Sequence, residues 1–389
     1  MLDFTNTEIA FKSKSNGDLR RAKLLFKVIA SPSVVRFGKW ATNLSLRLHL
    51  PISGIIKATI FKQFCGGESI EECKGRIEAL GAFGVGTILD YSVEGKTTDD
   101  DFEHTTQIII STIEMAKASK SIPFAVFKVT GIGRFDLLEI ASDSKSNPNE
   151  EILNEINRVK QRFERICEAA ANNQVRLFID AEETWIQPVL DAWTFEMMCK
   201  YNTQRAIIYN TVQMYRHDRL EFLKAQYERA KTAGIIYGVK LVRGAYMEKE
   251  RDRAQKIGYP SPIQPDKAST DRDYNEALRF MVEHHAHFAL CAGSHNEDSS
   301  MLLTKLMAEK QMNTRDEKFF FAQLLGMSDH ISYNLANAGY NVAKYVPFGP
   351  VKEVLPYLLR RADENTSVAG QTGRELGLIN AEVKRRSGR

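Results

Sequence analysis

The chain has 389 residues, of which 43% are hydrophobic and 26% are charged, and its formal net charge is +4. This is ordinary globular composition with enough apolar residues for a large core. The five cysteines form no CxxC pair, which argues against a disulfide framework or a zinc ribbon and favours a reducing compartment. No signal-peptide pattern opens the chain and no apolar run approaches the ~20 residues that span a bilayer, so we expect a protein that is soluble or lies on a membrane surface.

The positive charge is concentrated near the N-terminus. Between Ile9 and Phe64 there are eleven Lys or Arg residues and one acid, Asp18. Together with the apolar residues Leu24 to Phe26, this pattern suits a helix on an anionic membrane surface, and it equally suits the solvated side of a helical lid. Residues 1–82 show no strand pattern and are expected to form a helical segment, with Pro32 and Pro51 as helix breakers.

From about Gly84 onward, short β-rich runs alternate with segments of helical periodicity. The runs are 84–91, 124–130, 175–181, 205–213, 237–243, 288–292, 319–325 and 341–346. Eight strands separated by helices, such as those expected at 154–171 and 217–233, predict parallel strands joined by crossovers. Eight is the number of strands that closes a TIM barrel, so we predict an α/β fold, a distorted (βα)8 barrel. An open doubly wound sheet is the alternative.

The barrel is expected to occupy residues 83–366, followed by a C-terminal extension at 367–389. The polar stretch 141–151 (ASDSKSNPNEE) is expected to be an exposed linker within the second crossover.

Most of the predicted strands end in a polar residue, and the carboxyl ends of barrel strands are where active sites form. These residues are Asp90, Lys128, Asp180, Gln213, Lys240, Arg243, His295, Gln323 and Tyr345. Lys128 is unusual because the run around it is apolar. It could bind an anion as a cation paired with Asp180, or it could be the desolvated nucleophile of a Schiff-base aldolase.

The strongest local signal is YLLRRADEN, residues 357–365, in a helix that starts near Pro350 and is interrupted by Pro356. At 3.6 residues per turn, Tyr357, Arg360, Arg361 and Glu364 share one side of this helix. Two arginines beside a tyrosine can bind a carboxylate, although the same composition also suits a solvated salt-bridge ladder.

Two weaker signals are not taken as sites. Gly131-Ile-Gly133 lacks the third glycine of a dinucleotide fingerprint. His284, His285 and His287 are interpreted as the end of a helix and not as metal ligands, so no metal site is predicted.

Taken together, the motifs resemble those of the proline dehydrogenase family. YLLRRADEN resembles that family's YLxRRxxEN signature. Further segments follow in the family's order: DYSVE (90–94), Lys128, DAEE (180–183), Gln213, KLVRGAY (240–246), SHN (294–296), QLLGM (323–327) and Tyr345. The resemblance covers about 80–365 and is greatest to the monofunctional, eukaryotic-like branch.

The resemblance implies an FAD-dependent oxidation of L-proline to 1-pyrroline-5-carboxylate, the first step of proline catabolism, with hydride transfer to the flavin and a membrane quinone as electron acceptor. It implies that Arg360, Arg361 and Lys128 hold the substrate carboxylate and that Asp180 orients Lys128. The residues expected around the proline ring are Ala245, Tyr246, Leu324, Tyr345 and Tyr357. The residues expected to contact FAD are Gln213, Lys240, Val242, Gly244, Ala245, Lys267, Thr270, Ser294, His295, Asn296, Gln323 and Glu364. An ion pair of Glu94 with Arg360 is expected to close over the substrate.

The chain departs from many bacterial members at Lys240, where they have Arg, and at Met247, where they have Trp. Its seventh-strand glutamine stands one position later, which leaves the individual role of Gln323 open. Oxidation of 4-hydroxyproline is the alternative within the family, and Tyr345 argues against it because a tyrosine over the ring crowds a 4-hydroxyl. A non-catalytic binding barrel would not explain so many polar strand ends.

The expected partners are proline, the quinone and a membrane surface contacted through 9–64, without nucleic acid. The expected location is the cytoplasm or the inner face of a membrane, on the mitochondrial matrix side in a eukaryote.

Overall fold

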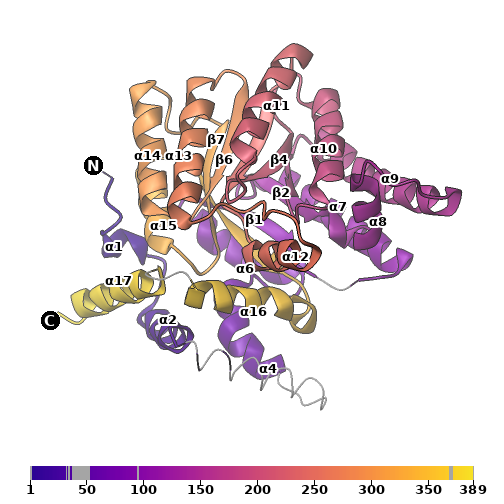
Figure 1. The fold of residues 1–389 in the computed structure, drawn as a ribbon. Helices are drawn as coiled ribbons and strands as arrows, with labels where there is room; N and C mark the ends of the chain where they lie inside the picture. Colours follow the sequence, from indigo (N-terminus) through magenta and orange to yellow (C-terminus); the bar gives the residue numbers. More distant parts are fainter. Residues whose placement is uncertain are drawn as a thin grey trace. The chain divides into compact units, whose positions relative to one another are not determined.

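A computed structural model describes residues 2–31, 33, 36, 53–93, 96–367 and 371–388. Eight parallel strands form a closed barrel in the order β1 to β8 (Figure 1), so the predicted (βα)8 fold is confirmed. The strands are β1 (Val85–Tyr91), β2 (Phe124–Lys128), β3 (Arg176–Asp180), β4 (Ile208–Gln213), β5 (Tyr237–Val242), β6 (Phe288–Gly293), β7 (Phe319–Leu324) and β8 (Val342–Phe348). Each of the eight predicted β-rich runs overlaps one of them, and the predicted and observed ends differ by a few residues at most.

The chain divides into two compact units, residues 1–95 with 323–389, and residues 96–322. The division into 1–82, 83–366 and 367–389 stays a prediction. The helical elements of the first unit are α1 (Thr7–Ala10), α2 (Asn16–Ile29), α4 (Ser53–Ile56), η1 (Lys57–Phe61), α5 (Lys62–Phe64), α6 (Ile70–Gly81), α15 (Asp329–Asn337), α16 (Val351–Ser367) and α17 (Gln371–Arg386). Those of the second are α7 (Asp99–Ala118), η2 (Val129–Gly131), α8 (Phe135–Ser142), α9 (Glu150–Asn172), α10 (Gln187–Tyr201), α11 (Arg219–Ala233), α12 (Met247–Ile257), α13 (Lys267–Glu283) and α14 (Glu297–Glu309).

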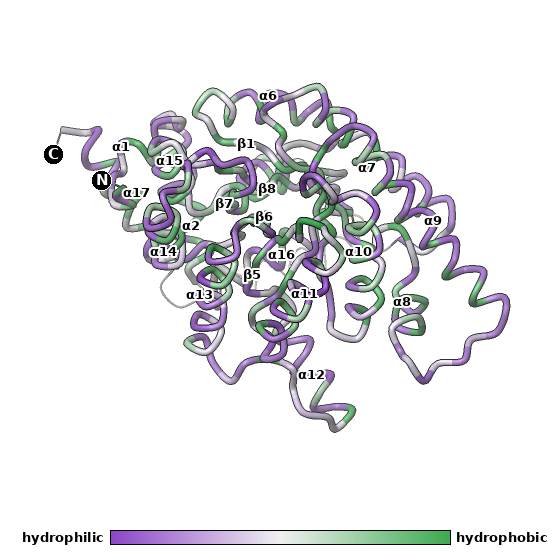
Figure 2. The backbone as a smooth tube through the Cα atoms, turned by 90° about the horizontal axis from the view of Figure 1, so that it is seen from above, coloured by the Kyte–Doolittle hydropathy of each residue, from purple (hydrophilic) through white to green (hydrophobic). Residues whose placement is uncertain are grey.

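Local sequence signals explain the helix ends. The Asn149 side chain accepts a hydrogen bond from the Ile152 amide and so caps α9, and two glutamates occupy the first turn, where the helix dipole favours negative charge. The residues of α9 that are buried recur at spacings of three and four, including Val159, Phe163 and Ile166. Hydrophilic and hydrophobic stretches accordingly alternate along α9 in Figure 2. Gly234 ends α11 with a φ of 67°, a conformation that suits glycine.

In the second unit, aromatic rings pack together inside the barrel, on the amino-terminal side of the polar residues Lys128 and Asp180. Phe124 of β2 stacks on Phe178 of β3, with ring centroids 4.2 Å apart. Tyr209 of β4 and Phe320 of β7 meet Phe124 edge to face. Side chains alternate between the two sides of a strand, so the residues two and four positions beyond these rings point to the same side. This packing places Lys128 and Asp180 on the inner side of the barrel, at the carboxyl ends of β2 and β3.

In the first unit, two clusters of buried side chains involve the N-terminal helices. One joins α1 and α2 to α17 and contains Phe11, Phe26 and Leu378. The other joins α2, η1 and α5 to α16 and contains Ile29, Phe64 and Leu358. Where it is described, the predicted N-terminal segment is therefore helical, and it packs on the two C-terminal helices. None of the described helices has the length and apolar character needed to cross a bilayer.

Candidate active site

Asp180, at the carboxyl end of β3, binds two lysines, one at the end of the neighbouring strand β2 and one on β5, two strands away. The Nζ of Lys240 on β5 donates a hydrogen bond to Asp180 Oδ1, and the Nζ of Lys128 on β2 lies 3.5 Å from Asp180 Oδ2. The side chains of Asp180 and Lys240 are each 10% exposed, and the Lys240 ammonium lies 5.4 Å from the centre of the Phe178 ring. Two ammonium groups thus lie beside one carboxylate on the inner side of the barrel, and ammonium groups are suited to binding an anionic substrate group.

This geometry separates the two interpretations of Lys128. A carboxylate 3.5 Å from its Nζ favours the ammonium form, because an opposite charge stabilises the charged state. A Schiff-base nucleophile needs the neutral amine. The arrangement therefore favours anion binding over aldolase chemistry.

A second carboxyl group lies behind Lys128. The Thr130 hydroxyl donates to Glu182 Oε2 at 2.5 Å and the Thr130 amide donates to Glu182 Oε1 at 3.2 Å. Burial, partly opposed by these hydrogen bonds and reinforced by the neighbouring Glu183, raises the pKa of Glu182 to about 7. The Gln213 amide donates to the carbonyl of Glu182 at 3.1 Å, so the predicted flavin residue on β4 is anchored to the loop that follows Asp180. Glu182 belongs to the DAEE segment (180–183), but its own role could not be predicted from the sequence.

Arg243, at the end of β5, anchors the next group of predicted residues. Its guanidinium donates to Asp271 Oδ1 at 2.7 Å, to Ser294 Oγ at 2.7 Å and to Ser299 Oγ at 2.9 Å. Lys267 also binds Asp271; burial of Asp271 is outweighed by these hydrogen bonds, so its pKa lies below its usual range. Arg243, together with Asp271, therefore brings Ser294 and Lys267 close to each other. In the sequence, Arg243 was evident only as a polar residue at a strand end.

Two helices begin beside this group. The Asn296 side chain caps α14 by accepting from the Ser299 amide at 2.8 Å. Asp266 caps α13, whose first turn contains Lys267 and Thr270. Helix N-termini carry partial positive charge and attract anions. Both helices thus present predicted cofactor residues at their positive ends.

The segment after β5 is open to solvent. Gly244 and Ala245 are exposed, and Val242 and Tyr246 are half-buried. Gly244 has a φ of 135°, and a Cβ there would lie 2.4 Å from the Tyr215 ring, so glycine is required at this position. The exposed backbone of Gly244 and Ala245 is accessible to a ligand.

In the first unit, Leu324 is the last residue of β7 and Tyr345 lies in the middle of β8. The Leu325 amide donates to the Tyr345 carbonyl at 2.9 Å, and Tyr345 is 8% exposed. Gln323 lies on the opposite side of β7, where its Oε1 accepts from the Ser332 hydroxyl of α15 at 2.8 Å. The structure thus turns the Gln323 side chain toward α15, and Leu324, the next residue along β7, points to the opposite side of the strand. The role of Gln323 toward FAD stays a prediction.

Helix α16 carries the arginine motif. Tyr357 and Arg361 are 6% and 9% exposed, and the Arg361 guanidinium lies 5.2 Å from the centre of the Tyr357 ring. They therefore share one side of the helix, as the periodicity indicates, and Arg360 beside them is half-buried. Glu94 and the Glu364 side chain lie outside the described residues, so the Glu94–Arg360 gate stays a prediction.

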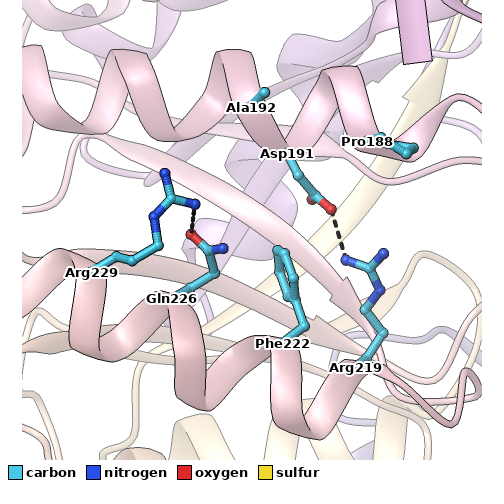
Figure 3. A pocket seen from close by; sticks show the side chains of 7 residues that line it. All are labelled: Pro188, Asp191, Ala192, Arg219, Phe222, Gln226 and Arg229. Atoms are coloured by element: carbon cyan, nitrogen blue, oxygen red, sulfur yellow. Dashed lines mark hydrogen bonds and ion pairs between the residues drawn. The ribbon is translucent and has the colours of Figure 1, made fainter. Parts of the chain in front are cut away.

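A separate pocket of about 380 Å³ lies between α10 and α11 (Figure 3). Arg219 donates to Asp191 at 2.7 Å, and Arg229 donates to Gln226 at 3.1 Å. Asp191 also accepts from Gln187 and Asn210. This pocket lies between two helices, whereas Lys128 and Asp180 end two strands of the barrel, which is where the active sites of barrels form.

The chain was compared with known proteins. The sequence profile of the family described as proline dehydrogenase matches residues 73–374. "Proline dehydrogenase 1, mitochondrial" of Dictyostelium discoideum is 32% identical over 98% of this chain and 74% of its own length. "Hydroxyproline dehydrogenase" of Xenopus laevis is also 32% identical, over 97% of this chain and 88% of its own.

Among solved structures, proline utilization A from Bdellovibrio bacteriovorus superposes with a TM-score of 0.74 at 19% identity, over 96% of this chain. The chain spans 39% of that protein's length, so this likeness supports the fold alone.

A parallel barrel with a cationic group at its carboxyl ends defines an enzyme scaffold. The match across residues 73–374 gives the class: this chain belongs to the proline dehydrogenase family of oxidoreductases. The family membership predicted from its motifs is therefore confirmed. The roles of the individual site residues stay predictions.

Proposed function

We propose that the chain oxidises L-proline to 1-pyrroline-5-carboxylate with FAD as its cofactor. The observation that carries this proposal is the pair of lysines, Lys128 and Lys240, held by Asp180 inside a barrel of this family. Oxidation removes a hydride from C5 and a proton from the ring nitrogen, and a C=N bond forms. Lys128, with Arg360 and Arg361, holds the substrate carboxylate, which fixes C5 at the place of hydride transfer.

The donor set fits a flavin dinucleotide. Arg243 and Lys267, together with the N-termini of α13 and α14, offer positive charge and N–H donors suited to a diphosphate. Lys240 and Gln213 offer donors at the strand ends for the polar edge of a ring system. When bound, FAD would accept the hydride at N5, as flavins do. The Asp180 carboxylate holds Lys240 in place beforehand, which spares reorganisation during the reaction.

One spectrum tests the proposal. Purified protein supplied with FAD should show flavin absorbance, and that absorbance should bleach when proline is added anaerobically. A protein that takes up no FAD, or whose bound flavin stays oxidised with proline, would refute it. Trapping of a keto substrate on Lys128 by borohydride would instead support the aldolase.

Discrimination between proline and 4-hydroxyproline is proposed to depend on Tyr345. Replacing it with serine should bring the ratio of kcat/KM values for the two substrates about tenfold closer to unity, because the phenol ring no longer crowds the 4-position. Tyr345→Phe keeps the ring and should keep the selectivity. The Xenopus relative named for hydroxyproline makes this comparison necessary. Unchanged selectivity in Tyr345→Ser would remove Tyr345 from this role.

We further propose that α2 contacts an anionic membrane, where a quinone would accept the electrons. The relative from Dictyostelium is named as mitochondrial, so the matrix side of the inner membrane is the proposed location. One side of α2 is buried against its neighbours, and the other exposes four basic residues and two apolar ones, with Leu24 65% and Val28 42% exposed. The basic residues are Arg20, Arg21, Lys23 and Lys27.

Vesicle flotation tests this contact. At low salt the protein should float with vesicles that contain anionic lipid, and the double variant Lys23→Glu/Lys27→Glu should bind at least about tenfold more weakly, because each basic residue contributes roughly 1 kcal/mol. Lys224→Glu/Lys231→Glu on α11 makes the same change in net charge and should float like the unaltered protein. Equal loss in both variants would show that only overall charge matters.

A further inference from the structure

The turn that joins β7 to α15, residues Leu324–Asp329, contains a buried electrostatic cluster. Asp329 Oδ1 lies 2.9 Å from the Nζ of Lys344 on β8, and Asp329 Oδ2 lies 3.2 Å from the Nζ of Lys14 in the loop before α2. The Lys344 side chain is fully buried. Although burial alone would raise the pKa of Asp329, the two ammonium groups hold it below its usual range. The turn therefore depends on a charge supplied from near the N-terminus.

The C-terminal helix holds the same turn. Glu375 of α17 accepts a hydrogen bond from the Ser328 amide. Ser328 is 1% exposed and has a φ of 50°, an uncommon conformation for a residue other than glycine. A buried amide needs an acceptor, and here a carboxyl group more than forty positions later in the chain supplies it.

The loop before α2 and α17 are also bound to each other. The Arg386 guanidinium donates to the carbonyls of Phe11 and Lys14 at 2.9 and 2.8 Å, and it pairs with Glu382. We call the loop with Lys14 and the helix with Glu375 the terminal clasp. Both parts of it contact the turn, one through Asp329 and the other through Ser328.

The same turn also fixes two residues that face the barrel interior. Lys344 donates to the carbonyls of Met327 and Leu324, and the Leu325 amide binds the Tyr345 carbonyl. Leu324 and Tyr345 are the residues proposed to pack around the proline ring. A shift of the turn would therefore be transmitted directly to both.

We propose that the terminal clasp sets the shape of the Leu324–Tyr345 side of the substrate pocket, with Lys14 and Glu375 as positioning residues. This inference rests on the proposed function, because it takes these two residues to line the proline site. The helices before and after the barrel would then help to position residues of the substrate pocket. Neither residue touches the substrate.

Glu375 gives the sharpest test. Glu375→Ala leaves the Ser328 amide without its acceptor, so the Michaelis constant for proline should rise about three- to tenfold while kcat changes less. Glu375→Gln keeps an oxygen acceptor and should restore most of the loss. Arg385→Met is the matched control on the same helix, because Arg385 pairs with Glu382 and Glu8 and not with the turn.

Binding of tetrahydrofuran-2-carboxylate, a ring carboxylate without an oxidisable nitrogen, gives a readout without turnover. Its dissociation constant, measured from the change in flavin absorbance, should rise by the same factor in Glu375→Ala. Lys14→Met, at a partly exposed position, should show a smaller increase and serves if Glu375→Ala does not fold.

The two proposals fail differently. If the unaltered protein does not bleach with proline, the proposed function fails. If the unaltered protein bleaches and a folded Glu375→Ala or Lys14→Met variant binds proline and the ring carboxylate as tightly as it does, the clasp inference is overturned.

Discussion

Replacing Arg360 with methionine should lower kcat/KM for proline by about 30- to 4,000-fold, with most of the loss in the Michaelis constant. The expected range corresponds to the ~2–5 kcal/mol lost when one partner of a buried charge pair is truncated. Methionine matches the aliphatic stem of arginine and keeps its apolar contacts, so the change removes mainly the guanidinium with its charge and forked donors.

The comparison that isolates the carboxylate is with pyrrolidine, which has the ring and no carboxyl group. If Arg360 binds the carboxylate, oxidation of pyrrolidine should be slow in both proteins and almost unaffected by the substitution. Arg229→Met on α11, where the guanidinium lies 4.1 Å from the Phe195 ring centre, should leave both substrates unaffected. Equal losses on proline and pyrrolidine in Arg360→Met would contradict the carboxylate clamp.

The barrel could be predicted because its signal is local. Each strand is a short β-rich run between helical segments, and the polar residue that ends it stands in the same run, as Lys128 does after Phe124 to Phe127. Alternation along the strand then decides which side chains point inward. The same logic showed that Tyr357 and Arg361 share one side of α16.

The partners of these residues could not be predicted, because they come from distant segments. Asp180 was expected to orient Lys128, but nothing local showed that Lys240, sixty positions later, would bind it more closely. Arg243 appeared only as a polar strand end, while its acceptors lie on Asp271, Ser294 and Ser299. The cluster of Lys14, Asp329 and Lys344 joins three segments whose separate sequences carry no sign of one another.

Burial of Glu182 has a similar origin and a consequence for stability. Its carboxyl group is 4% exposed, and its pKa is raised to about 7 chiefly by burial. Between its unfolded value of 4.5 and about 7, the folded protein holds a proton that the unfolded chain has released. The contribution of Glu182 to the free energy of unfolding is therefore fully present below pH 4.5, falls as the pH rises and is lost above pH 7. The total loss is roughly 3 kcal/mol.

Glu182→Gln should remove this dependence. The amide stays neutral at every pH, and its oxygen can still accept from the Thr130 amide while its NH2 group can donate to the Thr130 hydroxyl. The variant should therefore match the original protein near pH 5 and exceed it above pH 7, by up to roughly 3 kcal/mol in the free energy of unfolding. Denaturant unfolding at half-unit steps from pH 5 to 8, with saturating FAD in both proteins, measures the difference.

A second variant ties the effect to its cause. Glu183 contributes to the raised pKa of Glu182, so Glu183→Gln should move the midpoint of the stability loss to lower pH without abolishing it. Ionised Glu182 also adds negative charge near Lys128, so the Michaelis constant for proline should rise between pH 6 and 8 in the original protein and stay flatter in Glu182→Gln. Parallel stability curves for the original protein and Glu182→Gln across this range would show that Glu182 is already ionised at pH 5, and that burial does not govern its charge.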